Sequence, residues 1–212
     1  MLFRSEGIAV YNSAYIDGVI TVFMILFGIN FNLIYFFLIG KIAPVLKSEE
    51  LRGYLAIIAG STLLITLNIA SQYPSYLKAF RYAVFQVASI ITTTGFTTTN
   101  YDKWPMFSQT ILLLLMFIGA CAGSTGGGIK VSRIIMLSKQ AIQELKKMIH
   151  SRSVTTLNFE GEAIAPKTIS NVYSYLVLYL LVFAASLLIL SLENLDFQTT
   201  FSAVATCINN VR

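Results

Sequence analysis

The sequence predicts an all-α membrane protein in which transmembrane helices alternate with shorter helices that enter the membrane and return. Composition is the first reason: of the 212 residues, 56% are hydrophobic and 12% are charged, whereas soluble domains carry about 25% charged residues. The mean hydropathy is +0.71. Apolar runs long enough to cross a bilayer, which takes ~20 residues, recur along the chain. Between two of them, residues 79–91 form an apolar segment that is too short to cross and ends in a polar threonine–glycine turn.

Four segments are long and apolar enough to be transmembrane helices. They lie at residues 16–39, at residues 53–70, from Pro105 through residues 111–118, and at residues 168–192. Inside hydrocarbon every backbone N–H and C=O group needs a partner within the protein, so an open chain crosses as a helix. These four segments therefore predict the scaffold around the short segment at 79–91.

Charge asymmetry predicts the orientation of the chain. The linkers at residues 41–52 and 130–167 carry most of the lysines and arginines, and such linkers face the cytoplasm. The first helix then begins at the external face. The opposite loops contain four acidic residues, which either raise the local cation concentration or are ordinary interfacial residues and helix caps; they are Asp17, Asp102, Glu193 and Asp196.

The threonine–glycine turn has the composition of a re-entrant pore helix–filter loop. Cation pores replace the water shell of an ion with backbone carbonyls, and glycine permits the backbone conformations that aim successive carbonyls inward. The preceding helix directs the partial negative charge of its C-terminus at the ion. The predicted filter is Thr92, Thr93, Thr94, Gly95 and Phe96, with K⁺ held at Thr93, Thr94 and Gly95, and Phe96 is expected to wedge the loop against surrounding helices. The alternative is a polar external loop rich in threonine.

A second copy of this pattern follows with a shift of 117 residues. Ala88 falls on Ala205 and Ile91 on Ile208, so the threonines at 92–94 face three residues that follow a second short apolar segment. These residues are Asn209, Asn210 and Val211, and they predict the start of a second filter.

A glycine-rich stretch follows the third apolar run. Five glycines in the ten residues 119–128 disfavour a helix, since each costs up to ~1 kcal/mol relative to alanine. Non-helical backbone at membrane depth survives when it packs in protein or lines an aqueous cavity. We therefore expect a movable constriction below the filter, and the alternative is close helix packing through small residues. The predicted gate residues are Gly119, Gly123, Ser124, Thr125, Gly126, Gly127, Gly128 and Lys130. Lys130 either donates to the loop carbonyls or repels cations.

Together these motifs resemble the Trk/Ktr/HKT superfamily of potassium transporters. The resemblance rests on residues 93–98, on Trp104-Pro105 and on residues 122–130, and Gly28-Ile29-Asn30-Phe31 favours the bacterial Trk membrane subunit. It covers nearly the whole chain. Members have four potassium-channel-like pore repeats, each built as helix, pore helix, filter and helix.

The resemblance implies how the chain divides. Residues 1–52 correspond to the last helix of the second repeat plus a cytoplasmic linker. Residues 53–150 correspond to the third repeat, with its pore helix at 79–91, its filter at 92–96 and a long helix broken at 119–128. Residues 151–212 correspond to a linker and a fourth repeat that stops inside its filter, where Arg212 replaces the expected glycine. A chain of this extent is expected to be a C-terminal-half fragment that does not conduct alone.

The resemblance also implies a multi-pass protein of the bacterial inner membrane that takes up potassium. Its implied partners are K⁺, a second copy of itself in a homodimer, a cytoplasmic nucleotide-binding regulatory ring, and membrane lipid. No covalently bound cofactor and no nucleic acid are expected. The sequence leaves open whether transport is passive or coupled to H⁺ or Na⁺.

Other functions fit the residues less well. A simple tetrameric cation channel needs one pore unit per chain, whereas two unequal units occur here, and a non-conducting membrane scaffold leaves the filter-like loops unexplained. An enzyme is not expected, because no nucleophile–base pair or metal-ligand cluster has usable spacing. Cys121 and Cys207 are expected to be buried free thiols, and His150 to be a solvated linker residue.

Overall fold

The computed structural model describes residues 7–11, 13–149 and 157–211. Its α-helices are α1 (Ala14–Phe27), α2 (Phe31–Leu38), α3 (Ile42–Lys47), α4 (Glu49–Ile69), α5 (Tyr76–Ile91), α6 (Met106–Ile118), α7 (Val131–Ile149), α8 (Pro166–Ser191) and α9 (Phe197–Ile208). Short 3₁₀ turns are η1 (Gly7–Tyr11), η2 (Ala70–Gln72) and η3 (Tyr101–Lys103). Strands β1 (Asn158–Phe159) and β2 (Glu162–Ala163) pair antiparallel as a small hairpin. The expected all-α membrane fold is confirmed, and the hairpin is an addition to it.

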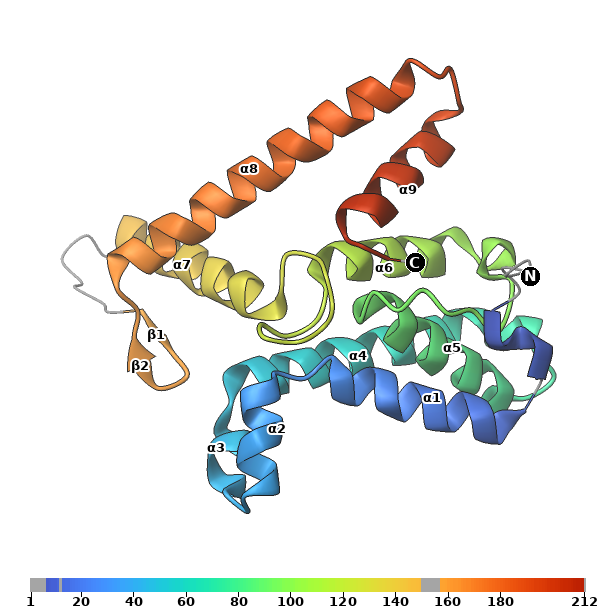
Figure 1. Ribbon diagram of the computed structural model, residues 1–212, viewed down its shortest axis with the longest axis horizontal. Helices are drawn as coiled ribbons and strands as arrows, with labels where there is room; N and C mark the ends of the chain where they lie inside the picture. Colours follow the sequence, from blue (N-terminus) through green and yellow to red (C-terminus); the bar gives the residue numbers. More distant parts are fainter. Residues whose placement is uncertain (1–6, 12, 150–156, 212) are drawn as a thin grey trace.

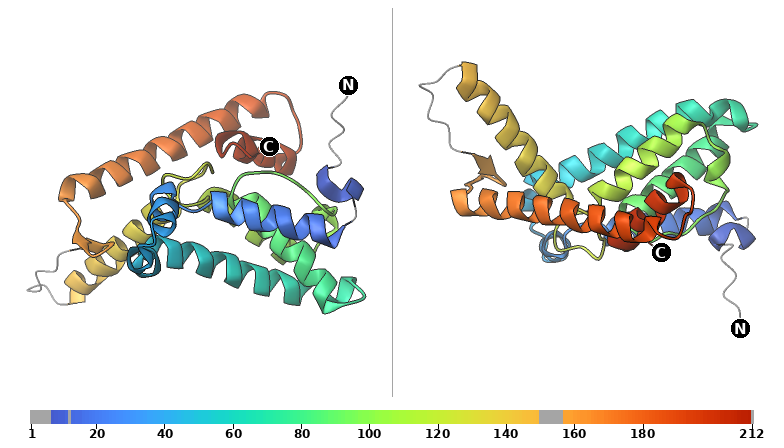
Figure 2. Two further views of the ribbon diagram at one scale, coloured as in Figure 1. Left: turned by 60° about the horizontal axis from the view of Figure 1, so that its bottom comes forward. Right: turned by 90° about the horizontal axis from the view of Figure 1, so that it is seen from above.

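The helices form two groups that meet at a loop. Helices α1, α4, α5 and α6 lie side by side, whereas α8 and α9 form a V on the other side of the molecule (Figure 1). The left view of Figure 2 shows the yellow loop between α6 and α7 lying between these two groups. The short helices α5 and α9 both run from the periphery toward this loop and end beside it.

Two of the described helices are long and apolar enough to cross a membrane. They are α4 together with η2, 24 residues at Glu49–Gln72, and α8, 26 residues at Pro166–Ser191. The second and fourth predicted spans are therefore confirmed as helices. The third apolar run forms α6, which has 13 residues and is ~20 Å long, so it stops short of a full crossing. The chain then leaves the helix at Gly119.

The first predicted span, residues 16–39, is not one helix. It forms α1 and α2, which meet at an angle of 102°. Gly28 caps the end of α1, and the Asn30 side chain accepts a hydrogen bond of 2.9 Å from the Asn32 backbone N–H at the start of α2. Asparagine is a preferred N-cap, so the bend has a local cause in the sequence. A Cβ at Gly28 would overlap the Tyr54 hydroxyl, so the backbone can approach α4 only without a side chain here.

The short helix α5 is the most buried of the membrane helices. It begins three residues before the predicted start at residue 79 and ends, as expected, at Ile91. Ala83, Val87 and Ile91 are fully buried against α4, whose Tyr54 is also fully buried. This packing fixes the end of α5 in the middle of the molecule.

An aromatic cluster joins the two groups of helices. Phe117 at the end of α6 contacts Phe183 of α8 at 5.6 Å and Phe201 of α9 at 6.2 Å between ring centroids. Edge-on aromatic pairs add about 0.5–1.5 kcal/mol beyond area burial. The cluster therefore holds α8 and α9 against the last turn before the glycine-rich stretch.

Candidate functional site

The end of α5 is a helix cap with an unusual residue. The N–H of Thr93 donates to the Ile90 carbonyl at 3.0 Å, and that of Thr94 donates to the Ser89 carbonyl at 2.9 Å. This pair of bonds defines a Schellman motif, which normally places glycine at the position with positive φ. Here that residue is Thr93, with φ +57°. A β-branched residue in this conformation is a genuine outlier, and such strain clusters at functional sites.

The end of α9 repeats the same cap. The N–H of Asn210 donates to the Cys207 carbonyl at 3.2 Å, and that of Val211 donates to the Thr206 carbonyl at 2.9 Å. Asn210 has φ +55°, and Asn209 has φ −85° and ψ 1°, against −87° and 1° at Thr92. The backbones of residues 92–94 and 209–211 therefore correspond at the shift of 117 that the sequence suggests.

Side chains hold the first turn, residues 92–96, in place. The Thr92 hydroxyl donates to the Ala88 carbonyl at 2.6 Å and lies 2.9 Å from the Thr94 hydroxyl. The Ser89 hydroxyl donates to the Phe96 carbonyl at 2.6 Å, and Gly95 has φ +75°. The expected wedge role of Phe96 is not seen, because within the described chain its side chain is 45% exposed.

Several carbonyls of these turns are unpaired. Among the described residues, no donor reaches the carbonyl oxygens of Thr93, Thr94, Gly95 or Asn209. Thr93 is 6% exposed and Asn209 is fully buried. Buried backbone carbonyls are nearly always paired. These oxygens are therefore free to accept a further ligand.

Residues 119–130, named here the glycine loop, form a closed ring. At its neck the N–H of Ile129 donates to the Phe117 carbonyl at 3.0 Å, and that of Lys130 donates to the Ile118 carbonyl at 2.9 Å. Gly119 and Gly128 cross at this neck with φ +71° and +79°, and a Cβ on Gly119 would overlap the carbonyl of Gly127. The ends of α6 and α7 are therefore joined directly, and the loop projects between them.

The glycine loop touches both helix ends. The N–H of Gly127 donates to the Thr93 hydroxyl at 2.9 Å, and a Cβ on the same glycine would overlap the Asn209 carbonyl oxygen. A Cβ on Gly126 would lie 3.3 Å from the Thr92 carbonyl oxygen. Gly126 and Gly127 thus allow the loop backbone to lie against the two turns that the sequence singles out.

The loop also pairs with the bend between α1 and α2. The N–H of Cys121 donates to the Gly28 carbonyl at 3.1 Å, and that of Phe31 donates to the Gly123 carbonyl at 3.3 Å. The Thr125 hydroxyl donates to the Phe27 carbonyl at 3.4 Å. Because the helix is interrupted at the bend, the Gly28 carbonyl and the Phe31 N–H are available for hydrogen bonds to the loop. These bonds link the Gly28–Phe31 motif to the glycine-rich motif.

Lys130 stabilises the glycine loop by bonding to another residue of the same loop. Its Nζ donates to the Gly126 carbonyl, which is the first of the two roles that the sequence left open. The residue has φ +84°. Next to it, the Arg133 guanidinium donates to the Ile129 carbonyl at 2.9 Å and lies 4.0 Å from the centroid of the Tyr175 ring.

Helix α8 supports the second turn through two tyrosines. The Tyr179 hydroxyl donates to Asn209 Oδ1 at 2.8 Å, and the Asn209 amide donates to the Ala205 carbonyl at 2.8 Å. The Tyr175 hydroxyl donates to the Gly128 carbonyl at 3.4 Å. One face of α8 is thus tied to the turn after α9 and to the neck of the glycine loop.

Glu50 is a site residue that the sequence does not single out. This residue is 4% exposed, and its Oε1 accepts a hydrogen bond of 2.6 Å from the N–H of Ala122 in the glycine loop. One of two adjacent acids in a polar linker gives no signal of burial, because its partner lies 72 residues away in the sequence. A buried carboxylate needs such a partner, so Glu50 is part of the structure around the loop.

The remaining residues that the sequence singles out lie away from the turns or have other environments. Asp17 is buried and forms an ion pair with Arg81 at 3.3 Å, which supports a structural role for this residue. Asp196 caps α9, and the Thr199 hydroxyl and backbone N–H hold the pKa of its carboxyl below its usual range. Cys121 is buried as expected, but Cys207 is exposed. His150 and Arg212 lie outside the described residues.

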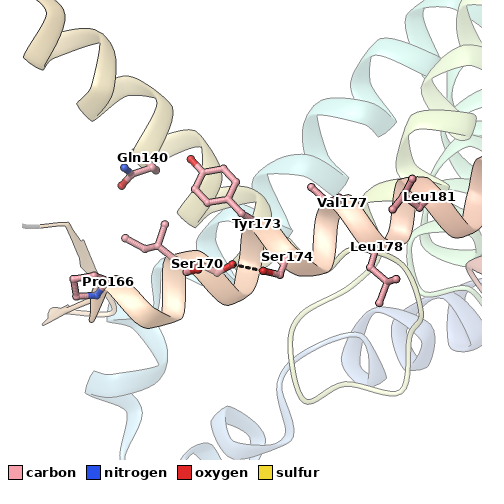
Figure 3. A pocket seen from close by; sticks show the side chains of 9 residues that line it. Gln140, Pro166, Ser170, Tyr173, Ser174, Val177, Leu178 and Leu181 are labelled. Carbon is pink, nitrogen blue, oxygen red and sulfur yellow. Dashed lines mark hydrogen bonds between the residues drawn. The ribbon is translucent and has the colours of Figure 1, made fainter.

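A groove of about 700 Å³ lies between α7 and α8. Figure 3 shows Gln140 of α7 opposite Tyr173, with Ser170 and Ser174 joined by a hydrogen bond along α8. The lining residues on α8 occupy the side of the helix opposite Tyr175 and Tyr179, which contact the glycine loop and Asn209. The groove is therefore separate from the turns and the loop.

Comparison with known proteins agrees with this arrangement. A model of the TrkH family, described as a cation transport protein, matches residues 3–211. The chain is 38% identical over 206 residues to the Trk system potassium uptake protein TrkH of Vibrio parahaemolyticus serotype O3:K6 (strain RIMD 2210633), covering 95% of this chain and 42% of that protein. It is 34% identical over 211 residues to the protein of the same name from Escherichia coli (strain K12), covering 98% and 44%.

A solved structure gives the same result. The crystal structure of the potassium transporter TrkH from Vibrio parahaemolyticus superposes with a TM-score of 0.90 at 37% identity, covering 97% of this chain and 45% of that chain. The chain thus spans less than half the length of the relatives it matches. By sequence match and by fold, the chain belongs to the TrkH family of cation transport proteins.

Proposed function

We propose that this chain forms part of a potassium uptake pathway across the bacterial inner membrane. The supporting observation is the pair of matching helix ends, with free carbonyls at Thr93, Thr94, Gly95 and Asn209, that meet at one loop. Two of the relatives are named potassium uptake proteins. In this proposal residues 92–96 form one filter segment and residues 209–211 begin another.

Electrostatics supports a cation at this place. The C-termini of α5 and α9 both end beside the glycine loop (Figure 1), and a helix C-terminus carries about half a negative charge. Among the described residues, no acidic side chain forms a hydrogen bond or ion pair with residues 92–96 or 209–211, so fixed negative charge does not hold these turns. Partial charges and carbonyl dipoles attract a cation while leaving it free to move on, which conduction requires.

The glycine loop is the proposed gate of this pathway. It lies against Thr92, Thr93 and Asn209, so it occupies the space next to both turns. It is held by backbone bonds to the bend between α1 and α2, by Lys130 and by Glu50. These are individual hydrogen bonds, so the loop can break them and form others while the helices stay packed.

The remaining assignments extend the family resemblance. We propose that residues 1–52 end a second pore repeat, that residues 53–150 form a third and that residues 151–212 begin a fourth. A homodimer and a cytoplasmic nucleotide-binding ring are the proposed partners. The chain alone is not expected to conduct, because it supplies two of the four filter segments that the resemblance implies.

Gly95 provides the test of the proposed filter. In a transporter of the relatives' full length that carries this chain, hereafter the complete transporter, Gly95→Val puts a β-branched side chain at φ +75°, where such residues are strained. We expect loss of growth on low potassium in a bacterium that lacks its own uptake systems, and a lower K⁺/Na⁺ flux ratio. The control is Gly60→Ala, at a helical position where a Cβ meets nothing within 4 Å. Normal growth and an unchanged ion preference for Gly95→Val would refute the filter assignment.

A further inference from the structure

The β-hairpin contacts the start of α4 through one side chain. Its two turn residues, Glu160 and Gly161, both have positive φ, +55° and +83°, as in a type I′ turn. The turn directs the Glu160 carboxylate at α4. There its Oε1 accepts one hydrogen bond of 2.9 Å from the Ser48 hydroxyl and another of 2.9 Å from the Glu50 backbone N–H.

This contact caps a helix from a distant part of the chain. The first N–H groups of a helix have no partner within it, and a negative charge at this end is favourable. Ser48 supplies the local cap, since its Oγ accepts from the Leu51 N–H at 3.2 Å. Glu160 supplies the second acceptor from 110 positions away. The first turn of α4 is therefore held by the hairpin.

Glu50 connects this cap to the glycine loop. Its backbone N–H is bound by Glu160, and its side chain accepts from the Ala122 N–H at 2.6 Å. A displacement of the first turn of α4 moves both bonds together. The hairpin, the helix start and the loop thus form one continuous set of contacts.

A lysine of α7 makes a second tie between the same elements. Lys139 Nζ donates to the Asn158 carbonyl in the hairpin at 2.8 Å and pairs with the Glu49 carboxylate in α4. Lys139 lies on the helix that leads directly out of the glycine loop. The hairpin is therefore joined to α4 by two independent polar contacts.

We propose that Glu160 and Glu50 are positioning residues that hold the glycine loop closed through the first turn of α4. This inference rests on the proposed gating role of the loop. Losing the hairpin contact leaves the Glu50 N–H unpaired and lets the first turn of α4 move. The Glu50 carboxylate then no longer holds Ala122, and the loop is released on that side.

The test is K⁺ flux through the complete transporter in liposomes, with no cytoplasmic protein added. Glu160→Ala is expected to raise the basal flux about tenfold, as expected for the loss of hydrogen bonds to a charged group. Glu160→Gln keeps an acceptor oxygen at the same place and is expected to restore low flux. The matched control is Glu162→Ala, because Glu162 lies on the same hairpin and its side chain makes no hydrogen bond to the described residues. Lys139→Met removes the contacts of Lys139 with Asn158 and Glu49 and is also expected to raise the basal flux. This variant replaces Glu160→Ala if the latter does not fold.

Two further measurements identify the route. Glu50→Ala combined with Glu160→Ala is expected to give no more flux than Glu50→Ala alone, because residues in one network are not additive. In a background that carries both Cys121→Ser and Cys207→Ser, the thiol introduced by Thr125→Cys is expected to react faster with a membrane-impermeant reagent when Glu160→Ala is present. The first result requires that the hairpin acts through Glu50, and the second requires that the hairpin contact restrains the loop.

The outcomes separate the two proposals. If deletion of residues 120–127 raises the flux but Glu160→Ala and Lys139→Met leave it unchanged, the coupling is refuted and the gate stands. If the deletion itself does not raise the flux in a well-folded transporter, the gate is refuted and the coupling with it. Additive flux in the Glu50–Glu160 double variant also refutes the proposed route.

Discussion

At the scale of the residue, the backbone at Thr93 and Asn210 distinguishes this protein from an ordinary helical bundle. Both residues have φ near +55°, where glycine is the usual choice. The threonine hydroxyl gives a reason for the exception, because it accepts from the Gly127 N–H at 2.9 Å. A glycine at position 93 would relieve the strain but would lose this contact with the loop.

Gly127 is the residue at which the loop most closely approaches the second turn. A Cβ there would overlap the Asn209 carbonyl oxygen, which belongs to the backbone and cannot rotate away. We expect Gly127→Ala to destabilise the complete transporter by about 1–3 kcal/mol, as overpacking does. The measurement is the thermal midpoint in detergent, followed by size-exclusion chromatography.

Gly60→Ala is the matched control for that substitution. Gly60 lies in α4, where an added Cβ meets nothing within 4 Å, and alanine in a helix is favoured over glycine by up to ~1 kcal/mol. The control should therefore keep or raise the thermal midpoint. Equal midpoints for the two variants would mean that the loop does not lie against Asn209.

At the scale of single residues, the sequence predicts some features of the site and not others. The end of the short helix at Ile91 and the shift of 117 residues were both predictable, because apolar periodicity stops at polar turn residues. The strained Thr93 was not, since local rules place glycine in that conformation and Gly95 lies only two residues later. Glu50 was not predictable either, because its burial depends on a loop 72 residues away.

At the scale of the element, α8 acts as a support for the turn after α9. The Tyr179 hydroxyl is bound to Asn209 Oδ1, and Asn209 is fully buried. We expect Tyr179→Phe to cost about 1–3 kcal/mol, because a buried acceptor loses its partner. The thermal midpoint of the complete transporter and its K⁺ flux are the measurements, and both should fall.

Tyr173→Phe is the control, since this tyrosine lies on the opposite face of α8, in the groove, and is 43% exposed. It should leave both measurements unchanged. If the two variants behave alike, α8 does not position the second turn through Tyr179.

The broken first span is the element that sequence reasoning described least well. The predominantly apolar run from residue 16 to residue 39 predicts one helix, and isolated glycines inside such a run are tolerated. The bend requires Gly28, the cap at Asn30 and the bonds offered by Cys121 and Gly123 together. The last two belong to the glycine loop, so the break is a tertiary effect that local pattern cannot reveal.

At the scale of the whole molecule, the distribution of charge predicts which end faces the cytoplasm. The hairpin and the end of α7 belong to the basic side, and η3 to the opposite side. In a Cys207→Ser background, the thiol introduced by Lys146→Cys should be labelled by an impermeant maleimide in inside-out vesicles. The thiol introduced by Lys103→Cys should be labelled on intact cells. Both native lysines are exposed, so accessibility alone does not decide the result, and the reversed pattern would invert the proposed direction of the pathway.

The neck of the glycine loop has a mechanical consequence. Because Phe117, Ile118 and Ala120 are hydrogen bonded to residues 129–131, the distance between α6 and α7 is fixed without any contribution from the tip of the ring. In its proposed gating role, the segment at residues 121–127 is expected to move while α6 and α7 keep their separation. Such a movement breaks hydrogen bonds to several elements, so it belongs to the microsecond-to-second range of lid opening. The proposed gate would therefore open without disturbing the hydrogen bonds that join α6 and α7.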